Sequence, residues 1–391
     1  MTNATALYQG LLSLLDRGQW QDRRHLKTAV NRIVGLILSS SISLTGWIPY
    51  AIRRALQAQS VQRRFARWLD NDRLDVHFLY APLIQEALLA WGEATLYLAL
   101  DTTMLWDQYC MIRLSVIYRG RAVPLAWQVV EHRSAQVAFR LYRDLLQRAA
   151  TLLPSGTRKV VLLADRGFAD VALMRLCDRL GWGYRLRIKS NFLVYRRGHG
   201  SALVKQLLPK RQGKAVFLHY VALTGERYGP VHVALAHPQG EEDPWLIVSN
   251  TLTGLQTFQE YGLRFDSEEN FLDDKSNGLQ LQDSTLRSAT AIERLFCGIA
   301  TATLYLVVQG SEVVAQGRRR EVDPHWFRGS SYLKIGWQWL KHAMIKGWQL
   351  ITGWCLRGGE DPDPAMASRR QYETAQRKFQ RFTCVTIAYA T

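Results

Sequence analysis

The first part of the chain has apolar residues at helical spacing. Between residues 7 and 91 they recur every three to four positions, for example at Val30, Ile33 and Val34. Such spacing places the apolar side chains on one face of an α-helix. We therefore predict that residues 1–93 form a helical N-terminal region.

The pattern becomes extended at residues 95–100, a short apolar run that is followed directly by Asp101. A run of this kind is typical of a buried central strand. Two further β-rich runs, 111–118 and 122–130, are separated by Arg119, Gly120 and Arg121, which predicts a tight hairpin. We expect three antiparallel strands here, with an acid at the tip of the first.

A helix and a second buried strand are predicted next. Residues 135–152 have a helical pattern, and the apolar run 159–164 ends at Asp165. An amphipathic helix over 170–180 and a strand over 181–188 follow. Three hairpin strands, a helix and a returning strand are the opening order of an RNase H-like sheet. The predicted fold class is therefore α/β, with a mixed sheet.

The pattern of apolar and polar residues changes between residues 191 and 250. Alternating patterns at 216–223 and 231–236, with glycine-rich turns between them, indicate short β-strands. We interpret this segment as a β-rich insertion rather than a continuation of the sheet. It would divide the RNase H-like core into a first part, 94–190, and a second part, 251–310.

Helices are predicted for the rest of the chain. Residues 253–256 have the spacing of a capping box, and the helix that they open can run to Lys275, before a Ser-Asn-Gly stop. A second, apolar helix is predicted over 291–308. Five tryptophans beyond residue 317 indicate packed helices, so we expect 311–391 to be a basic helical C-terminal region.

The charge of the chain indicates an anionic partner. Lys and Arg number 50 against 33 Asp and Glu, which leaves a net charge of +17. An excess of this size concentrates polyanions near a protein, although it also occurs in proteins that need only solubility. The doublets Arg53-Arg54 and Arg63-Arg64 could lie against a DNA backbone, and solvated helix faces are the alternative.

The sequence does not indicate a disulfide framework, a zinc site, a signal peptide or a membrane span. Hydrophobic residues make up 48% of the chain, which is typical of a globular protein. The five cysteines form no Cys-x-x-Cys pair, so neither a disulfide framework nor a zinc finger is expected. No signal peptide is recognisable, and the longest apolar stretch, 295–308, is too short to span a bilayer. We expect a cytoplasmic protein with no membrane partner.

Asp101 and Asp165 each follow an apolar run that is predicted to be a strand. Asp101 and Asp165 would lie side by side, where two carboxylates repel each other unless a cation lies between them. Magnesium prefers such an all-oxygen site, and two ions can promote in-line phosphoryl displacement. For either acid alone, a turn or capping role is the alternative.

A third group of residues has helical spacing. At 100° per residue, four side chains fall within about 60° of one helix face: Tyr261, Arg264, Glu268 and Lys275. Glu268 can complete a metal site, and the two cations can hold phosphates beside it. An exposed helix with salt bridges is an equally good interpretation of the pattern alone.

Taken together, the motifs resemble a known family. The pattern Y-x2-R-x3-E-x6-K at 261–275 is similar to the signature of the insertion-sequence-four family of bacterial DDE transposases. The segments 99–103 and 164–168, around the two aspartates, are similar to that family's first two motifs. The resemblance extends over about 95–308, with acid spacings of 64 and 103 residues.

The resemblance implies the roles of six residues. The metal ligands and catalytic residues would be Asp101, Asp165 and Glu268, which would hold two Mg²⁺ (or Mn²⁺) ions. The residues that grip DNA phosphates would be Tyr261, Arg264 and Lys275. One aromatic residue of the insertion would stack on a flipped base; Trp245 is a candidate, although a core role is the more frequent one for such a residue.

The implied function is cut-and-paste transposition of an insertion sequence, by hydrolysis, hairpin formation and strand transfer. Its partners would be double-stranded DNA, namely the terminal inverted repeats and the target, and a second copy of the chain. No nucleotide cofactor is expected, because no G-x4-G-K-[ST] motif occurs. The alternatives are a structure-directed nuclease, a catalytically idle DNA-binding protein, or a basic RNA-binding or structural protein.

Overall fold

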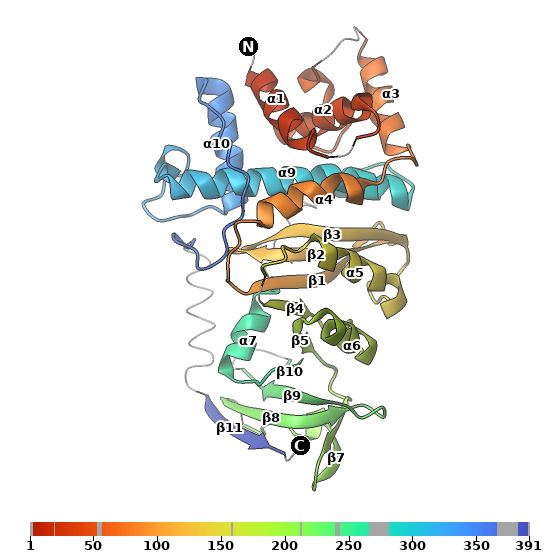
Figure 1. The fold of residues 1–391 in the computed structure, drawn as a ribbon, viewed down its shortest axis with the longest axis vertical. Coiled ribbons are helices and arrows are strands. Elements are labelled where there is room, and N and C mark those ends of the chain that lie inside the picture. The colour runs from red at the N-terminus through yellow and green to blue at the C-terminus, as the bar shows by residue number, and fades with distance from the viewer. Residues whose placement is uncertain are drawn as a thin grey trace.

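One mixed β-sheet extends from the middle of the molecule to one of its ends, and helices pack against it (Figure 1). The computed structural model describes residues 3–18, 20–52, 57–157, 159–211, 213–238, 243–265, 281–365 and 382–389. Within these residues the sheet has 11 strands, in the order β3-β2-β1-β4-β5-β10-β9-β8-β6-β7, and β11 pairs with β8. Most strand pairs are antiparallel and three are parallel, so the predicted α/β class with a mixed sheet is confirmed.

The strands are β1 Leu96–Leu105, β2 Tyr109–Tyr118, β3 Arg121–Glu131, β4 Val160–Ala164, β5 Gly183–Arg187, β6 Leu193–Arg196, β7 Gly200–Leu203, β8 Lys214–Leu223, β9 Tyr228–Ala236, β10 Trp245–Ser249 and β11 Thr383–Ala388. The α-helices of the described residues are α1 Asn3–Leu15, α2 Arg23–Ser39, α3 Ala58–Leu69, α4 Val76–Leu88, α5 Arg143–Leu152, α6 Val171–Leu180, α7 Leu255–Gly262, α9 Ala289–Ala315 and α10 Tyr332–Lys346. In Figure 1 the helices α1–α4, α9 and α10 lie at one end of the molecule, and β7–β9 and β11 lie at the other.

The three predicted antiparallel strands are present as β1, β2 and β3. Strands β2 and β3 pair in antiparallel fashion across Arg119 and Gly120, whose φ angles of 50° and 81° lie in the left-handed region that tight hairpin turns need. The first strand, however, does not end at Asp101. It continues to Leu105, because its antiparallel ladder with β2 runs from Leu98 through Asp101 to the end of the strand.

The sheet continues on the other side of β1 with two parallel strands. β4 pairs in parallel with β1, and β5 pairs in parallel with β4. The connecting helix α5 begins at Arg143 rather than at residue 135. A helix cannot begin earlier, because Ala138 has an extended backbone, and the Ala135 carbonyl accepts a hydrogen bond from Thr102 Oγ1 of β1.

Residues 191–250 are rich in strands, as predicted, but they continue the sheet rather than standing apart from it. β10 pairs with β5 in antiparallel fashion, with Ile247 opposite Arg187 and Val248 opposite Leu186. The backbone N–H of Ile188 also donates to the carbonyl of Leu246. The reason is general: without β10, the strand β5 would be an edge with unpaired backbone groups.

The end of the chain also differs from its prediction as a wholly helical region. α10 is a helix, but residues 383–388 form the strand β11, which pairs in parallel with β8 along Lys214–His219. β8 has ten residues, and β6 pairs only with its far end, at Ala222 and Leu223. The near end of that edge is therefore open to β11.

The N-terminal helices and the sheet share one hydrophobic core, which α9 joins together. This helix has 27 residues, longer than the predicted 291–308, and its apolar side chains contact buried residues of α2, α4 and β3. Among the described residues it is the one helix long and apolar enough to cross a membrane. Its most apolar stretch is 89% buried inside the protein, as in the core helix of a soluble protein.

Helices α9 and α10 cross at two glycines. A Cβ atom on Gly310 would overlap the backbone carbonyl of Tyr332, and one on Gly336 would overlap the carbonyl of Leu306. The two backbones are therefore in direct contact, an arrangement that any larger residue would prevent.

We predict that Gly310→Ala lowers the free energy of unfolding by about 1–3 kcal/mol, because the two helices must move apart. The matched control is Gly298→Ala on the same helix, where the added Cβ would meet no atom within 4 Å. That variant should gain about 0.5–1 kcal/mol, since alanine favours helix over glycine. Urea denaturation followed by circular dichroism measures both values, and equal stabilities would contradict the close crossing.

Candidate active site

Asp101 and Asp165 lie next to each other in the structure. The parallel ladder of β1 and β4 ends with Leu100 opposite Ala164, and each aspartate is the next residue of its chain. The charge of Asp165 acts on Asp101, whose pKa it raises. The two predicted acids are thus brought together from positions 64 residues apart.

The carboxyl group of Asp101 is largely buried, and its hydrogen-bond donors offset only part of the cost of burying its negative charge. Its side chain is 13% exposed, and burial is the main reason why its pKa rises from 3.8 to about 6. Two donors oppose this shift. Arg264 Nη1 donates to Oδ2 at 3.2 Å, and the backbone N–H of Thr102 donates to Oδ1 at 2.8 Å.

Asp165 is held in a tight turn. Its Oδ1 accepts a hydrogen bond from the backbone N–H of Gly167 at 2.9 Å, and its carbonyl accepts one from Phe168. A Cβ on residue 167 would lie 3.1 Å from that carboxylate oxygen, closer than such atoms normally approach, so glycine suits the turn. Phe168 is buried against Tyr142 and anchors the turn to the core.

Two residues of the predicted Tyr-Arg-Glu-Lys group, Tyr261 and Arg264, lie near the two aspartates, in α7 and just after it. Tyr261 is completely buried, and burial is the main reason why the pKa of its hydroxyl is raised, while the nearby guanidinium of Arg264 opposes this shift. Arg264 follows the end of the helix and reaches Asp101. Between them, Leu263 packs on the cluster of Ala99, Val161 and Leu163, which belong to β1 and β4.

The predicted continuous helix from residue 253 is not observed. α7 begins after Gly254, and Thr253 instead donates its hydroxyl to the Val233 carbonyl. The helix ends at Gly262, where the N–H groups of Leu263 and Arg264 bond to carbonyls three rather than four residues back. Tyr261 and Arg264 therefore do not lie on one regular helix.

The two remaining members of the predicted group, Glu268 and Lys275, lie outside the described residues. Within the described part of the chain, no group of three or more His, Cys, Asp or Glu side chains could hold a metal ion. Asp101 and Asp165 are thus a pair of candidate ligands.

Sequence analysis missed the residue that attaches α7 to the sheet. Glu260 accepts a hydrogen bond from Arg185 of β5 at 2.6 Å and one from the Tyr97 hydroxyl of β1 at 3.1 Å. Arg185 also donates to Ser249 Oγ of β10 at 2.8 Å. An arginine in the middle of the short strand β5, between Tyr184 and Leu186, is the sequence signal that could have indicated a buried partner.

Trp245 is partly buried and packs against other aromatic side chains. Its ring lies 5.6 Å from the ring of Tyr261 and 6.2 Å from those of Phe258 and Phe265, measured between centroids. These rings join α7 to the strands β8–β10 of the same sheet. The side chain of Trp245 therefore supports the helix that carries Tyr261 and Arg264.

We predict that Glu260→Ala lowers the free energy of unfolding by about 3–5 kcal/mol, because it leaves the charge of Arg185 buried without its partner. The side chains of this pair are 4% and 16% exposed. Glu226→Ala is the matched control, since its ion pair with Arg175 is 50–57% exposed and should contribute less than about 1 kcal/mol. Urea denaturation of both variants tests this, and equal losses would show that Glu260 does not anchor α7.

The raised pKa of Asp101 predicts a dependence of stability on pH in metal-free protein. The folded state holds this proton more tightly than the unfolded state, so the free energy of unfolding falls as pH rises from about 4 to 6, by up to about 3 kcal/mol. Asp101→Asn removes this titration. The difference in stability between wild type and variant should therefore change across that range, and parallel profiles would contradict the burial of the charge.

Comparison with known proteins adds no assignment. No protein-family model matches the chain, and no curated protein sequence matches it significantly. The conclusions about the site therefore rest on the residues and on their geometry.

Proposed function

We propose that this protein is a DNA transposase of the DDE type, which cuts and joins the ends of its own insertion sequence. One observation carries the proposal: Asp101 and Asp165 lie side by side at the end of the parallel ladder of β1 and β4. Asp101 is paired with Arg264, a member of the motif that the sequence shares with the insertion-sequence-four family.

The sheet supports an RNase H-like core. Its first five strands have the order β3-β2-β1-β4-β5, with β1–β3 antiparallel and with β4 and β5 parallel to β1. In this proposal the strands β6–β10 are the insertion that separates the second acid from the third. Glu268 would complete the triad.

The residues present fit a divalent metal. Two neighbouring carboxylates offer the oxygen ligands that Mg²⁺ prefers, and the raised pKa of Asp101 reflects a negative charge that its surroundings do not fully compensate. Asp101, Asp165 and Glu268 would hold two Mg²⁺ or Mn²⁺ ions. When bound, the ions supply the Lewis acid that hydrolysis and exchange of phosphodiesters require.

The neighbouring side chains would hold the DNA. The guanidinium of Arg264 lies at the carboxylate of Asp101, and the hydroxyl of Tyr261 lies near the same guanidinium. With Lys275 they would bind the phosphates next to the scissile bond. The reaction would nick one strand, and the released 3′-hydroxyl would attack the opposite strand to form a hairpin, which is reopened and joined to target DNA.

The N-terminal region offers a surface for the DNA backbone. Helix α3 buries Phe65 and Trp68 and exposes three arginines, Arg63, Arg64 and Arg67. The doublet Arg53-Arg54 lies outside the described residues. This basic surface and the net charge of +17 support binding to double-stranded DNA. We propose that two copies of the chain act together on the DNA. The location would be the cytoplasm, at the nucleoid.

A gel assay tests the proposal. The purified protein is incubated with Mg²⁺ and labelled DNA that carries the ends flanking its own gene. We expect hairpin ends and joined products from the wild type. We expect at least a hundredfold loss of both with Asp101→Ala, Asp165→Ala or Glu268→Ala, whereas DNA binding persists.

Asp170→Ala is the matched control for these variants. Asp170 is a nearby acid, but its carboxylate caps α6 by accepting the N–H of Ala172. This variant should retain cleavage. Cleavage without joining would favour a structure-directed nuclease, and binding without cleavage by the wild type would favour a DNA-binding protein without catalysis. Either result would overturn the proposal.

A further inference from the structure

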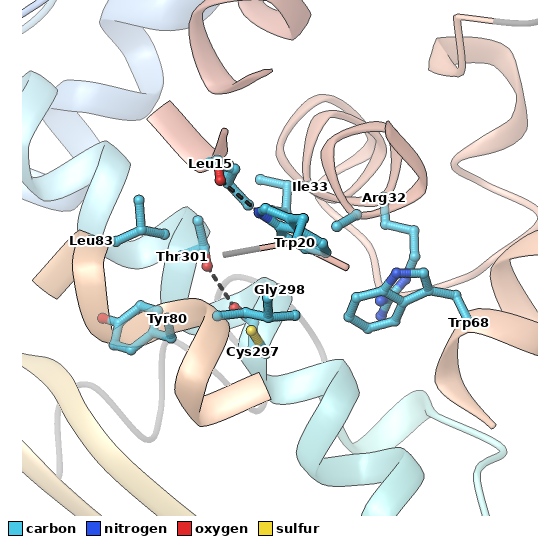
Figure 2. A pocket seen from close by; sticks show the side chains of 12 residues that line it. Leu15, Trp20, Arg32, Ile33, Trp68, Tyr80, Leu83, Cys297, Gly298 and Thr301 are labelled. Carbon is cyan, nitrogen blue, oxygen red and sulfur yellow. Dashed lines mark hydrogen bonds between the residues drawn. The ribbon is translucent and has the colours of Figure 1, made fainter. Parts of the chain in front are cut away.

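A small cavity lies between the N-terminal helices and α9 (Figure 2), and neither Asp101 nor Asp165 is among the residues that line it. Its volume is about 20 Å³. The lining side chains come from α1–α4 and α9 and from Trp20, and most of them are apolar or aromatic. Arg32 of α2 is the one charged residue among them.

Arg32 is buried without an anionic partner. The residue is only 2% exposed, and its buried Nε–H makes no hydrogen bond with the described residues. The guanidinium stacks on the indole ring of Trp68, 4.1 Å from the ring centroid, and lies 5.6 Å from that of Trp47. Burial lowers its pKa to about 9, so it still carries its charge at neutral pH.

The other polar groups around the cavity are satisfied. Trp20 donates its indole N–H to the Leu15 carbonyl, and Thr301 donates its hydroxyl to the Cys297 carbonyl (Figure 2). The indole N–H of Trp68 bonds to the His25 carbonyl. Among the described residues that line the cavity, the Nε–H of Arg32 is therefore the buried side-chain donor that still needs an acceptor.

Two other buried arginines, Arg294 and Arg328, are each paired with an aspartate. Arg294 bonds to Asp72 at 2.9 Å, and Arg328 bonds to Asp361 at 2.5 Å. Buried charges in proteins are normally paired in this way, because an isolated ion in an apolar environment is costly. Arg32 has aromatic rings where these arginines have a carboxylate.

We propose that the cavity binds one small monovalent anion of halide size, which pairs with Arg32. The charge of the guanidinium selects an anion over water, and the cavity has room for only one or two water-sized bodies. A phosphate or sulfate is too large for it. The bound anion neutralises Arg32 and thereby stabilises the packing of α2 and α3 against α9.

Thermal unfolding in different sodium salts tests this proposal. Wild-type protein is compared in gluconate and in increasing chloride or bromide, at constant ionic strength and pH. Because the anion binds the folded state, Tm should rise by about 2 °C for each tenfold increase in halide above its Kd. Arg32→Met should show no such dependence.

Arg294→Met is the matched control. It removes another buried arginine, so it should unfold at a lower temperature but keep the halide dependence of the wild type. A Tm of the wild type that is equal in gluconate and halide, or an unchanged dependence in Arg32→Met, would overturn the proposal.

A second measurement does not need a variant that folds. Crystals of the wild-type protein grown or soaked in bromide should show an anomalous peak within hydrogen-bond distance of the Arg32 guanidinium. A cavity that holds only water, without anomalous signal, would overturn the proposal.

Discussion

The parallel pairing of β1 with β4 is the constraint on which the candidate site depends. Its backbone hydrogen bonds place Leu100 opposite Ala164, and the next residue on each strand is an aspartate. The backbone of Asp101 is held in its ladder with β2, and the carboxylate of Asp165 is held by the turn at Gly167. The sheet thus keeps two like charges together at a cost in free energy, which a bound cation would relieve.

The second requirement is the position of α7. Glu260 ties this helix to β1 and β5, and Phe258 and Tyr261 pack on the strands β8–β10. The helix therefore rests on both the first five strands and the added ones. Since α7 positions Arg264 at Asp101, the strands β8–β10 contribute to the site although none of the predicted acids lies on them.

The helical end of the molecule depends on close packing around α9. Glycines allow the backbones of α9 and α10 to touch, and the side chains of α9 form one core with the N-terminal helices and β3. Arg32 is buried in this core. Through this core the basic helix α3 is packed against α9 and thereby attached to the sheet.

The sequence by itself determined the local elements: the hairpin at Arg119-Gly120, the buried strands before Asp101 and Asp165, and most of the helices. These follow from turn residues and from the period of apolar positions, which act over a few residues. Only the tertiary structure decided that β10 extends the sheet at β5, that β11 joins β8, and that Glu260 meets Arg185. Backbone pairing at a strand edge is nearly independent of side chains, and a buried ion pair joins distant positions. Neither leaves a periodic signal in the chain.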